Sequence, residues 1–373
     1  MSMGKIGIVT FPLWESNVTP LCNLLGIINH LTDQALIITG NAGCNAVQKF
    51  KNFHFELIYH TSGSNAFTKT YNYAKTQLNI VLRMMRLSND IDLWIFPIGG
   101  EVLLPCMALA KILRRPTIMS LTSSTEFMMK HQQHPLASIV IFFAKINYHL
   151  ADRIILYSPR LIPEWNLEPY RHKIRIAHEH FLDFNTFTVT TPLPDRPPLI
   201  GYIGRLSGEK GVQHFAEALP AILGDREDLR VLIGGDGQLK DSIVATLQEE
   251  GLTARVALPG WISHDDLPNY LNQLRLLVLP SYTEGLPNIM LEAMACGTPV
   301  LATPVGAIPD VIIDGETGFI MENNSPECIA ENVVRALASP DLEEIAEAGR
   351  RFVEENFTFE NVVARWKEVL EEI

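Results

Sequence analysis

A chain of 373 residues, 47% of them hydrophobic and 19% charged, has the composition of a globular protein with two or three domains. The net charge of −12 argues against general nucleic-acid binding. The five scattered cysteines, without a Cys-x-x-Cys pair, argue against a zinc cage or disulfide framework. Since no secretory signal pattern opens the chain, we expect a cytoplasmic protein.

The charge is unevenly distributed along the chain. Residues 1–190 hold 17 Lys and Arg against 12 Asp and Glu, whereas residues 191–373 hold 13 against 30. This asymmetry favours two domains with different partners.

Short apolar runs alternate with longer helical patterns throughout. In the first half we expect strands at 5–10, 35–39, 55–59, 93–96, 117–121 and 153–156. In the second half we expect strands at 199–203, 230–234, 255–259, 276–279 and 299–303. This rhythm predicts an α/β protein with two Rossmann-like, doubly wound parallel sheets.

The prolines of residues 188–201 mark the expected domain boundary. We therefore predict an N-terminal domain at 1–190 and a C-terminal domain at 191–356. Residues 357–373 form an amphipathic pattern that predicts a terminal helix docked on the body. Residues 135–150 are too short, and too interrupted by Lys145 and His149, to span a bilayer. A buried helix is the first interpretation of this segment, and interfacial membrane contact is the alternative.

The segment 283–300 places Glu292 inside an apolar helix that Pro287 begins and Gly297 ends. An unpaired buried carboxylate costs several kcal/mol, unless it accepts hydrogen bonds, for example from the diol of a ribose. The helix N-terminus in front of it favours a phosphate. Glu284, in the preceding loop, would reach hydroxyls beyond that phosphate. The alternative is that Glu292 pairs with a structural arginine and that Glu284 is a solvated loop charge.

A second cluster, in residues 201–211, follows the first strand of the second half. Arg205 and Lys210 lie among glycines that permit close backbone approach, and two cations at a strand end suit a diphosphate. The spacing matches neither a dinucleotide fingerprint nor a P-loop.

The stretches GRLSGEKG, LPGW, PSYTEGLPNIMLEAMACGTPV and VGAIPDVIIDGETGF occur in this order. With them, residues 199–357 closely resemble the retaining glycosyltransferases of family 4. The core of the resemblance is the Glu-x7-Glu motif, here Glu284 and Glu292. It implies the GT-B fold, in which two Rossmann-like domains face a cleft and the terminal helix crosses back to the first domain.

The resemblance also implies roles for individual residues. Arg205, Lys210 and Glu284 would be catalytic, with the two cations on the donor diphosphate and Glu284 on the donor sugar. Glu292 would bind the ribose. The remaining donor-binding candidates are Gly204, Gly260, Trp261, Ile262, Gly285, Leu286, Pro287 and Asn288.

The implied reaction is transfer of a sugar from a nucleotide diphosphate donor, with UDP-sugars favoured, and with retention at the anomeric carbon. The leaving phosphate is thought to take the acceptor proton, so no metal and no cofactor are expected. Asp90-Ile91-Asp92 has the Asp-x-Asp metal pattern of the other glycosyltransferase fold. It precedes an expected strand, at the wrong end for a ligand.

The first half departs from the family. The loop at 11–20 lacks the usual glycine pair, and Thr122 stands where many members have a histidine. The acceptor-side candidates are Trp14, Asn17, Thr122, His131 and His134. The sequence His178-Glu179-His180 suggests a metal ligand set, but we assign it to the linker.

These departures leave two alternatives to an active transferase: a sugar-nucleotide epimerase and an inactive sugar-nucleotide-binding subunit. We expect the acceptor to be a sugar, a glycan or a lipid-linked molecule. The basic first half and residues 135–144 favour peripheral contact with a membrane.

Overall fold

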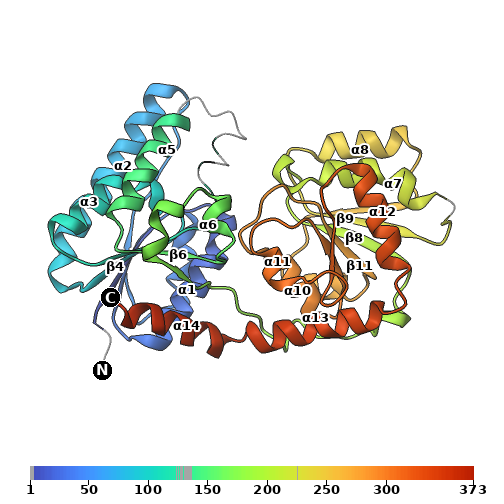
Figure 1. Cartoon of the computed structure of the whole chain (residues 1–373). Helices are drawn as coiled ribbons and strands as arrows, with labels where there is room; N and C mark the ends of the chain where they lie inside the picture. Colours follow the sequence, from blue (N-terminus) through green and yellow to red (C-terminus); the bar gives the residue numbers. More distant parts are fainter. Residues whose placement is uncertain (1–3, 123, 125, 127–128, 130–136, 225) are drawn as a thin grey trace. The chain divides into compact units, whose positions relative to one another are not determined.

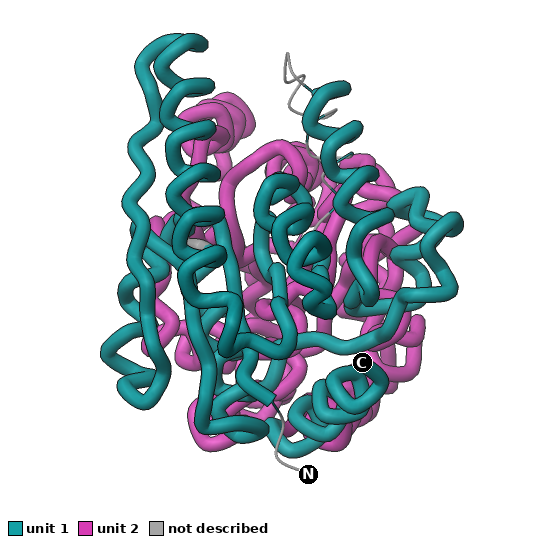
Figure 2. The backbone as a smooth tube through the Cα atoms, turned by 90° about the vertical axis from the view of Figure 1, so that its left-hand side faces the viewer, with its two compact units in different colours: residues 1–181, 359–373 teal, residues 182–358 magenta. Residues whose placement is uncertain are grey.

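The structure is a computed structural model that describes residues 4–122, 124, 126, 129, 137–224 and 226–373. The chain divides into two compact units, coloured separately in Figure 2. Unit 1 comprises Met1–Phe181 and Phe359–Ile373, and unit 2 comprises Leu182–Thr358.

Unit 1 is built on a seven-stranded sheet with the order β3-β2-β1-β4-β5-β6-β7, in which every neighbouring pair is parallel. The strands are β1 (Ile6–Val9), β2 (Ala35–Thr39), β3 (His54–Leu57), β4 (Leu93–Phe96), β5 (Thr117–Ser120), β6 (Arg153–Leu156) and β7 (Ile174–Ile176). The central strands are buried along almost their whole length, because helices cover both faces of the sheet.

The helices of unit 1 form two groups, labelled in Figure 1. One group is α1 (Val18–Leu31) and α14 (Phe359–Glu371), which contact each other and share a core with Ile8 and Ile37. Trp366 of α14 is fully buried in this core, and its Nε1 donates a hydrogen bond to the carbonyl of His178 at 2.9 Å.

The other group is α2 (Ala66–Leu87), α3 (Leu104–Ile112) and α5 (Ala137–Leu150), with α3 in contact with both others. Successive strand residues point to opposite faces, so this group covers the face away from Ile8. The remaining helical turns of unit 1 are α6 (Leu161–Glu164) and the 3-10 turns Glu15–Asn17, Ala42–Ala46, Ser88–Asp90, Gly100–Val102 and Glu168–Lys173.

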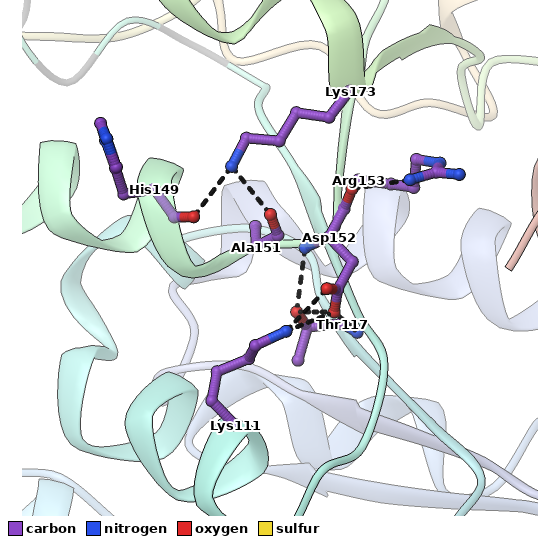
Figure 3. Close-up of polar contacts among 7 residues, drawn as sticks. All are labelled: Lys111, Thr117, His149, Ala151, Asp152, Arg153 and Lys173. Atoms are coloured by element: carbon purple, nitrogen blue, oxygen red, sulfur yellow. Dashed lines mark hydrogen bonds and ion pairs between the residues drawn. The ribbon is translucent and has the colours of Figure 1, made fainter.

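Two lysines fasten this second group to the sheet (Figure 3). Lys111 of α3 donates to both carboxylate oxygens of Asp152, at 2.7 and 2.8 Å, and Asp152 also accepts from the backbone and hydroxyl of Thr117. Burial opposes ionisation of Asp152, but the hydrogen bonds from Lys111 and Thr117 keep its pKa below the ordinary value. Lys173 donates to the carbonyls of His149 and Ala151, both at 2.9 Å, and so satisfies the C-terminal end of α5.

Unit 2 has a six-stranded parallel sheet with the order β10-β9-β8-β11-β12-β13. Its strands are β8 (Leu199–Ile203), β9 (Arg230–Gly234), β10 (Val256–Gly260), β11 (Leu276–Leu279), β12 (Val300–Ala302) and β13 (Phe319–Ile320). Its helices are α7 (Val212–Leu223), α8 (Lys240–Glu249), α9 (Leu267–Leu271), α10 (Asn288–Ala295), α11 (Ile308–Val311), α12 (Pro326–Leu337) and α13 (Leu342–Asn356). Two 3-10 turns, Leu193–Asp195 and Gly208–Lys210, complete the unit.

The prediction of two doubly wound parallel-sheet domains is confirmed. Strands β7 and β13 were not predicted, because they are only three and two residues long and carry no apolar run of their own. The five cysteines carry free thiols. Among the described residues, no helix is both long enough and apolar enough to cross a membrane.

The first interpretation of residues 135–150, a buried helix, is wrong for the described part. In α5 only Ala144, Asn147 and Tyr148 are buried, whereas Ile139, Phe142 and Phe143 are exposed. An apolar composition shows that a helix has apolar side chains on several sides. It does not show whether the protein covers all of them.

Candidate functional site

Three loops at the carboxyl ends of β8, β9 and β10 are hydrogen-bonded to one another. The backbone N–H of Gly204 donates to Gly234 at 3.0 Å, that of Leu206 donates to Asp236 at 2.9 Å, and that of Gly235 donates to Gly260 at 2.7 Å. In doubly wound sheets this edge is where ligands bind.

Gly235 is required at the centre of these loops. Its φ is +130°, and a Cβ atom there would stand 1.8 Å from the carbonyl oxygen of Gly204. A residue with a side chain would therefore be strained and would push the first two loops apart.

The loops enclose a cavity of about 340 Å³ within unit 2. Its lining residues are Ile203, Gly204, Arg205, Gly235, Asp236, Trp261 and Ile262. Four of the predicted donor-site residues, Gly204, Arg205, Trp261 and Ile262, thus line one cavity although they come from segments far apart in the sequence. The indole of Trp261 is mostly exposed.

Arg205 and Lys210 lie on either side of Glu209. Arg205 is 3.5 Å from the carboxylate of Glu209, which also accepts from Ser207 at 2.7 Å. Burial raises the pKa of Glu209. The hydrogen bonds that its carboxylate accepts from Ser207 and from the backbone, together with the charges of Arg205 and Lys210, outweigh burial and bring the pKa below its ordinary value. The side chain of Arg205 remains more than half exposed.

Lys210 is directed to Glu284. Its Nζ lies 2.7 and 2.8 Å from the two carboxylate oxygens, and Ser281 donates to the same carboxylate at 2.7 Å. The Glu284 side chain is only 9% exposed. The interpretation of Glu284 as a solvated loop charge is therefore wrong, because its side chain is mostly covered and forms an ion pair with Lys210.

Glu292 lies on α10 and is buried. Among the described residues, no arginine forms an ion pair with Glu292. Arg196, a buried arginine at the other end of α10, donates instead to the carbonyl of Cys296 at 2.6 Å and to Thr298 Oγ1 at 2.7 Å. Burial lowers the pKa of Arg196 to about 10. The contact of Glu292 is His264 Nε2 at 3.4 Å, and the side chain of His264 is 62% exposed.

The loop that leads into α10 is fixed by backbone contacts. Gly285 accepts a hydrogen bond from the N–H of Ala307 at 2.8 Å, and the carbonyl of Ser281 accepts from Thr303 at 2.6 Å. Leu286 is buried, Pro287 caps the helix, and Asn288 begins it. The first backbone N–H groups of α10 therefore have a fixed direction and lack intrahelical partners.

The acceptor-side candidates lie in unit 1 where they are described. Trp14 and Asn17 follow β1, and Thr122 follows β5, so all three lie at the carboxyl edge of that sheet. The indole of Trp14 is exposed. His131 and His134 lie outside the described residues.

The two other patterns considered for metal have other contacts. Asp92 accepts a hydrogen bond from the N–H of Lys5 at the amino end of β4. His178, Glu179 and His180 are buried after β7, where Glu179 accepts from Tyr157 at 2.6 Å. In the part of the chain that the structure describes, no group of three or more His, Cys, Asp or Glu side chains is arranged to hold a metal ion.

One feature at the carboxyl edge of unit 1 was missed. Directly after β4, Ile98 and Gly99 have φ values of +31° and +78°. Positive φ is costly for a β-branched residue and marks a position that its surroundings must hold. The adjacent Gly-Gly pair after an expected strand was the available signal. It follows β4, whereas the family's usual pair follows the first strand.

The two parallel-sheet units define a GT-B protein. Over 99% of this chain and 100% of the other, the structure resembles that of HepE from Anabaena, solved in complex with UDP, with a TM-score of 0.80 at 18% sequence identity. At this identity the likeness concerns the fold, and it confirms the GT-B prediction.

Sequence comparison is more specific, but only for unit 2. Residues 183–352 match the family model described as Glycosyl transferases group 1. The alpha-D-kanosaminyltransferase of Streptomyces kanamyceticus is 31% identical over 45% of this chain and 45% of its own length. The D-inositol 3-phosphate glycosyltransferase of a Mycobacterium species is 30% identical over 47% of this chain and 42% of its own length. The chain thus spans less than half the length of these curated relatives.

Proposed function

We propose that this protein is a retaining glycosyltransferase that transfers a sugar from a nucleotide diphosphate donor, with UDP-sugars as the preferred class. The observation that carries the proposal is the cavity of unit 2, where Gly204, Arg205, Trp261 and Ile262 meet. The matches of residues 183–352 to glycosyl transferases, and the UDP in the HepE crystal, support the donor class.

In this proposal the donor diphosphate binds Arg205 and Lys210. Guanidinium and ammonium groups that are already in place stabilise the negative charge that develops on the leaving diphosphate. Lys210 forms an ion pair with Glu284. Donor binding would therefore exchange part of this ion pair for contacts of Lys210 with phosphate and of Glu284 with the donor sugar.

Glu292 is assigned to the ribose hydroxyls. Its contact with His264 does not compete strongly, because the His264 side chain is 62% exposed and water screens the contact. The base would lie against Gly260, Trp261 and Ile262. The segment Gly285–Asn288, with Leu286 and Pro287, would offer backbone amides to phosphate and sugar.

The acceptor would be bound by unit 1, near Trp14, Asn17 and Thr122, and we assign it to sugars, glycans or lipid-linked molecules. The leaving phosphate would take the acceptor proton, so neither a metal nor a cofactor enters the proposed reaction. The domain limits that we propose for the two roles are 1–190 and 191–356, with 357–373 as the returning helix.

The test is incubation of the purified protein with a panel of nucleotide sugars and acceptors. Nucleotide release that requires an acceptor, with the donor's anomeric configuration kept in the product by NMR, is the expected result. A changed sugar still attached to its nucleotide would identify an epimerase instead. Tight nucleotide binding without turnover over a broad acceptor panel would identify a binding subunit.

A further inference from the structure

Helix α2 carries apolar side chains on the face that is turned to solvent. Its side chains Phe67, Tyr71, Leu78, Leu82 and Met85 are each more than half exposed. They are separated by three, four or seven positions, so they share one face of the helix. The face turned to the protein is partly polar instead.

That inner face includes buried Thr76 and Gln77. The hydroxyl of Thr76 is 2.9 Å from His60 Nδ1, and Gln77 Nε2 donates to the carbonyl of Val102 at 2.7 Å. Ile80 and Met84 are fully buried on the same inner face. Helix α2 thus packs on unit 1 through a mixed polar and apolar face, and further apolar side chains are left outside. Exposed apolar side chains gathered on one face mark a contact with a partner or a membrane.

Helix α5 continues the pattern. Ile139, Phe142 and Phe143, all in its first half, are exposed. In a parallel α/β unit the helices run opposite to the strands, so α2 and α5 both begin at the carboxyl edge of the sheet. Figure 1 shows both helices at that end of unit 1, and α3 contacts each of them. The aromatic residues Phe67, Tyr71, Phe142 and Phe143 therefore lie at the same edge.

The charge of these helices has one sign. Neither α2, α3 nor α5 contains an Asp or Glu, although the whole chain has 42. Lys111 is neutralised by Asp152, and Arg83 pairs with Glu56. By contrast, Lys69, Lys75 and Arg86 of α2 have no ion-pair partner among the described residues, and all three are exposed.

We propose that the exposed faces of α2 and the first half of α5 dock unit 1 on an anionic lipid bilayer. The apolar side chains would enter the headgroup region, and Lys75 and Arg86, which flank the apolar face, would contact lipid phosphates. This charge distribution distinguishes a bilayer from a second copy of the chain: two copies meeting through this face would oppose like charges. The inference extends the proposed function, since it rests on the lipid-linked class of acceptor that the function allows.

Flotation with vesicles tests the proposal without donor or acceptor, so its failure leaves the transferase proposal standing. The full chain is expected to float with phosphatidylglycerol-containing vesicles at low salt and to detach at high salt. It should not float with pure phosphatidylcholine. Absence of flotation with anionic vesicles at low salt would overturn the proposal.

Two variants separate the apolar from the electrostatic contribution. Leu78→Gln with Leu82→Gln should abolish flotation, and Lys75→Gln with Arg86→Gln should lower the partition coefficient about fivefold per charge removed. Because these side chains are exposed, circular dichroism and UDP binding should not change. The matched control is Ile313→Gln with Val334→Gln, which replaces two exposed apolar residues of unit 2 and should float like the unaltered chain.

The competing occupant, a second copy, gives a different result in sedimentation velocity. A dimer that Leu78→Gln with Leu82→Gln dissociates, together with vesicle binding that these substitutions leave unchanged, would contradict the bilayer assignment.

Discussion

Unit 2 and unit 1 share a fold plan but differ in how they use the carboxyl edge of the sheet. In unit 2, three loops are linked by backbone hydrogen bonds, Lys210 and Glu284 form a 2.7 Å ion pair, and Arg205 lies 3.5 Å from Glu209. In unit 1, the residues at that edge include the exposed Trp14 and the strained turn at Ile98. The comparison teaches that a site fixed by backbone geometry leaves a strong sequence signature, whereas a surface for a variable partner does not.

Removal of Lys210 should have the largest effect on activity. Lys210→Ala takes away the cation that we assign to the leaving diphosphate and leaves Glu284 without its ion-pair partner. We expect kcat/KM to fall by about 10²–10³. Steady-state kinetics with saturating acceptor measures this, with Arg226→Ala as control, because Arg226 forms an exposed pair with Asp228.

The same assay applied to Trp14→Ala sharpens the comparison between the units. If Trp14 belongs to the acceptor side, the KM for acceptor should rise and the affinity for UDP should stay unchanged. An equal loss of UDP affinity in this variant would mean that donor binding is not confined to unit 2.

Substitution of Glu292 should affect donor affinity next most strongly. We assign Glu292 to the ribose hydroxyls. Glu292→Gln removes the charge of this hydrogen-bond acceptor, so the Kd for UDP should rise about 10- to 100-fold. Calorimetry measures this, and His264→Gln should change the Kd little. If both variants altered stability alike and neither altered the Kd, Glu292 would be a structural partner of His264.

Gly235 tests whether the linked loops of unit 2 require their backbone geometry. Gly235→Ala should lower the free energy of unfolding by about 1–3 kcal/mol and weaken UDP binding, because of the close carbonyl of Gly204. Gly251→Ala is the matched control: its φ is also positive, at +68°, but nothing lies within 4 Å of the added methyl group. It should be destabilised less in scanning calorimetry and should bind UDP normally.

The smallest expected effect concerns the pH stability of unit 1. Burial lowers the pKa of His178 to about 4 and that of His180 to about 3. In the unfolded chain the pKa of both side chains is near 6.5, so below pH 6.5 they take up protons when the protein unfolds but not while it is folded. The contribution of these two histidines to the free energy of unfolding is therefore fully present above pH 6.5 and is lost as the pH falls toward 4. Burial also raises the pKa of Glu179 to about 7, which acts in the opposite direction, because stability is lost as the pH rises from 4.5 through 7.

His180→Phe separates these contributions. The phenyl ring keeps the edge contact with Tyr157 and removes one buried basic group. Between pH 6.5 and 4, the free energy of unfolding should fall less in the variant than in the unaltered protein, by about 1 kcal/mol or more. Urea unfolding at a series of pH values measures this, with the exposed His172→Gln as control. An unchanged pH dependence would show that His180 is not the buried group that protonates on unfolding.

Much of the fold was predictable because buried parallel strands are continuous apolar runs. Strands β2, β4, β6, β8, β9 and β11 have the predicted bounds. The short strands β7 and β13 were not predictable in this way. The exposure of α5 was not predictable either, because a helix pattern alone does not reveal which of its sides the rest of the chain covers.

The candidate site was also predictable only in part. Lys210 and Glu284 lie in the glycine-containing loops that follow β8 and β11, and these two strands are neighbours in the sheet. Charges in two loops at one edge of the sheet were therefore predictable. The ion pair between Lys210 and Glu284 was not predictable, because it depends on the directions of side chains in two loops. The buried Tyr157–Glu179 pair was missed because its members lie after different strands.

A crystal structure with bound UDP tests the central claim most directly. The account predicts the nucleotide in the cavity of unit 2, with the base beside Trp261, the ribose hydroxyls on Glu292 and the diphosphate on Arg205 and Lys210. A nucleotide bound elsewhere, or one bound there while Glu292 stays on His264 and makes no contact with the ribose, would contradict it.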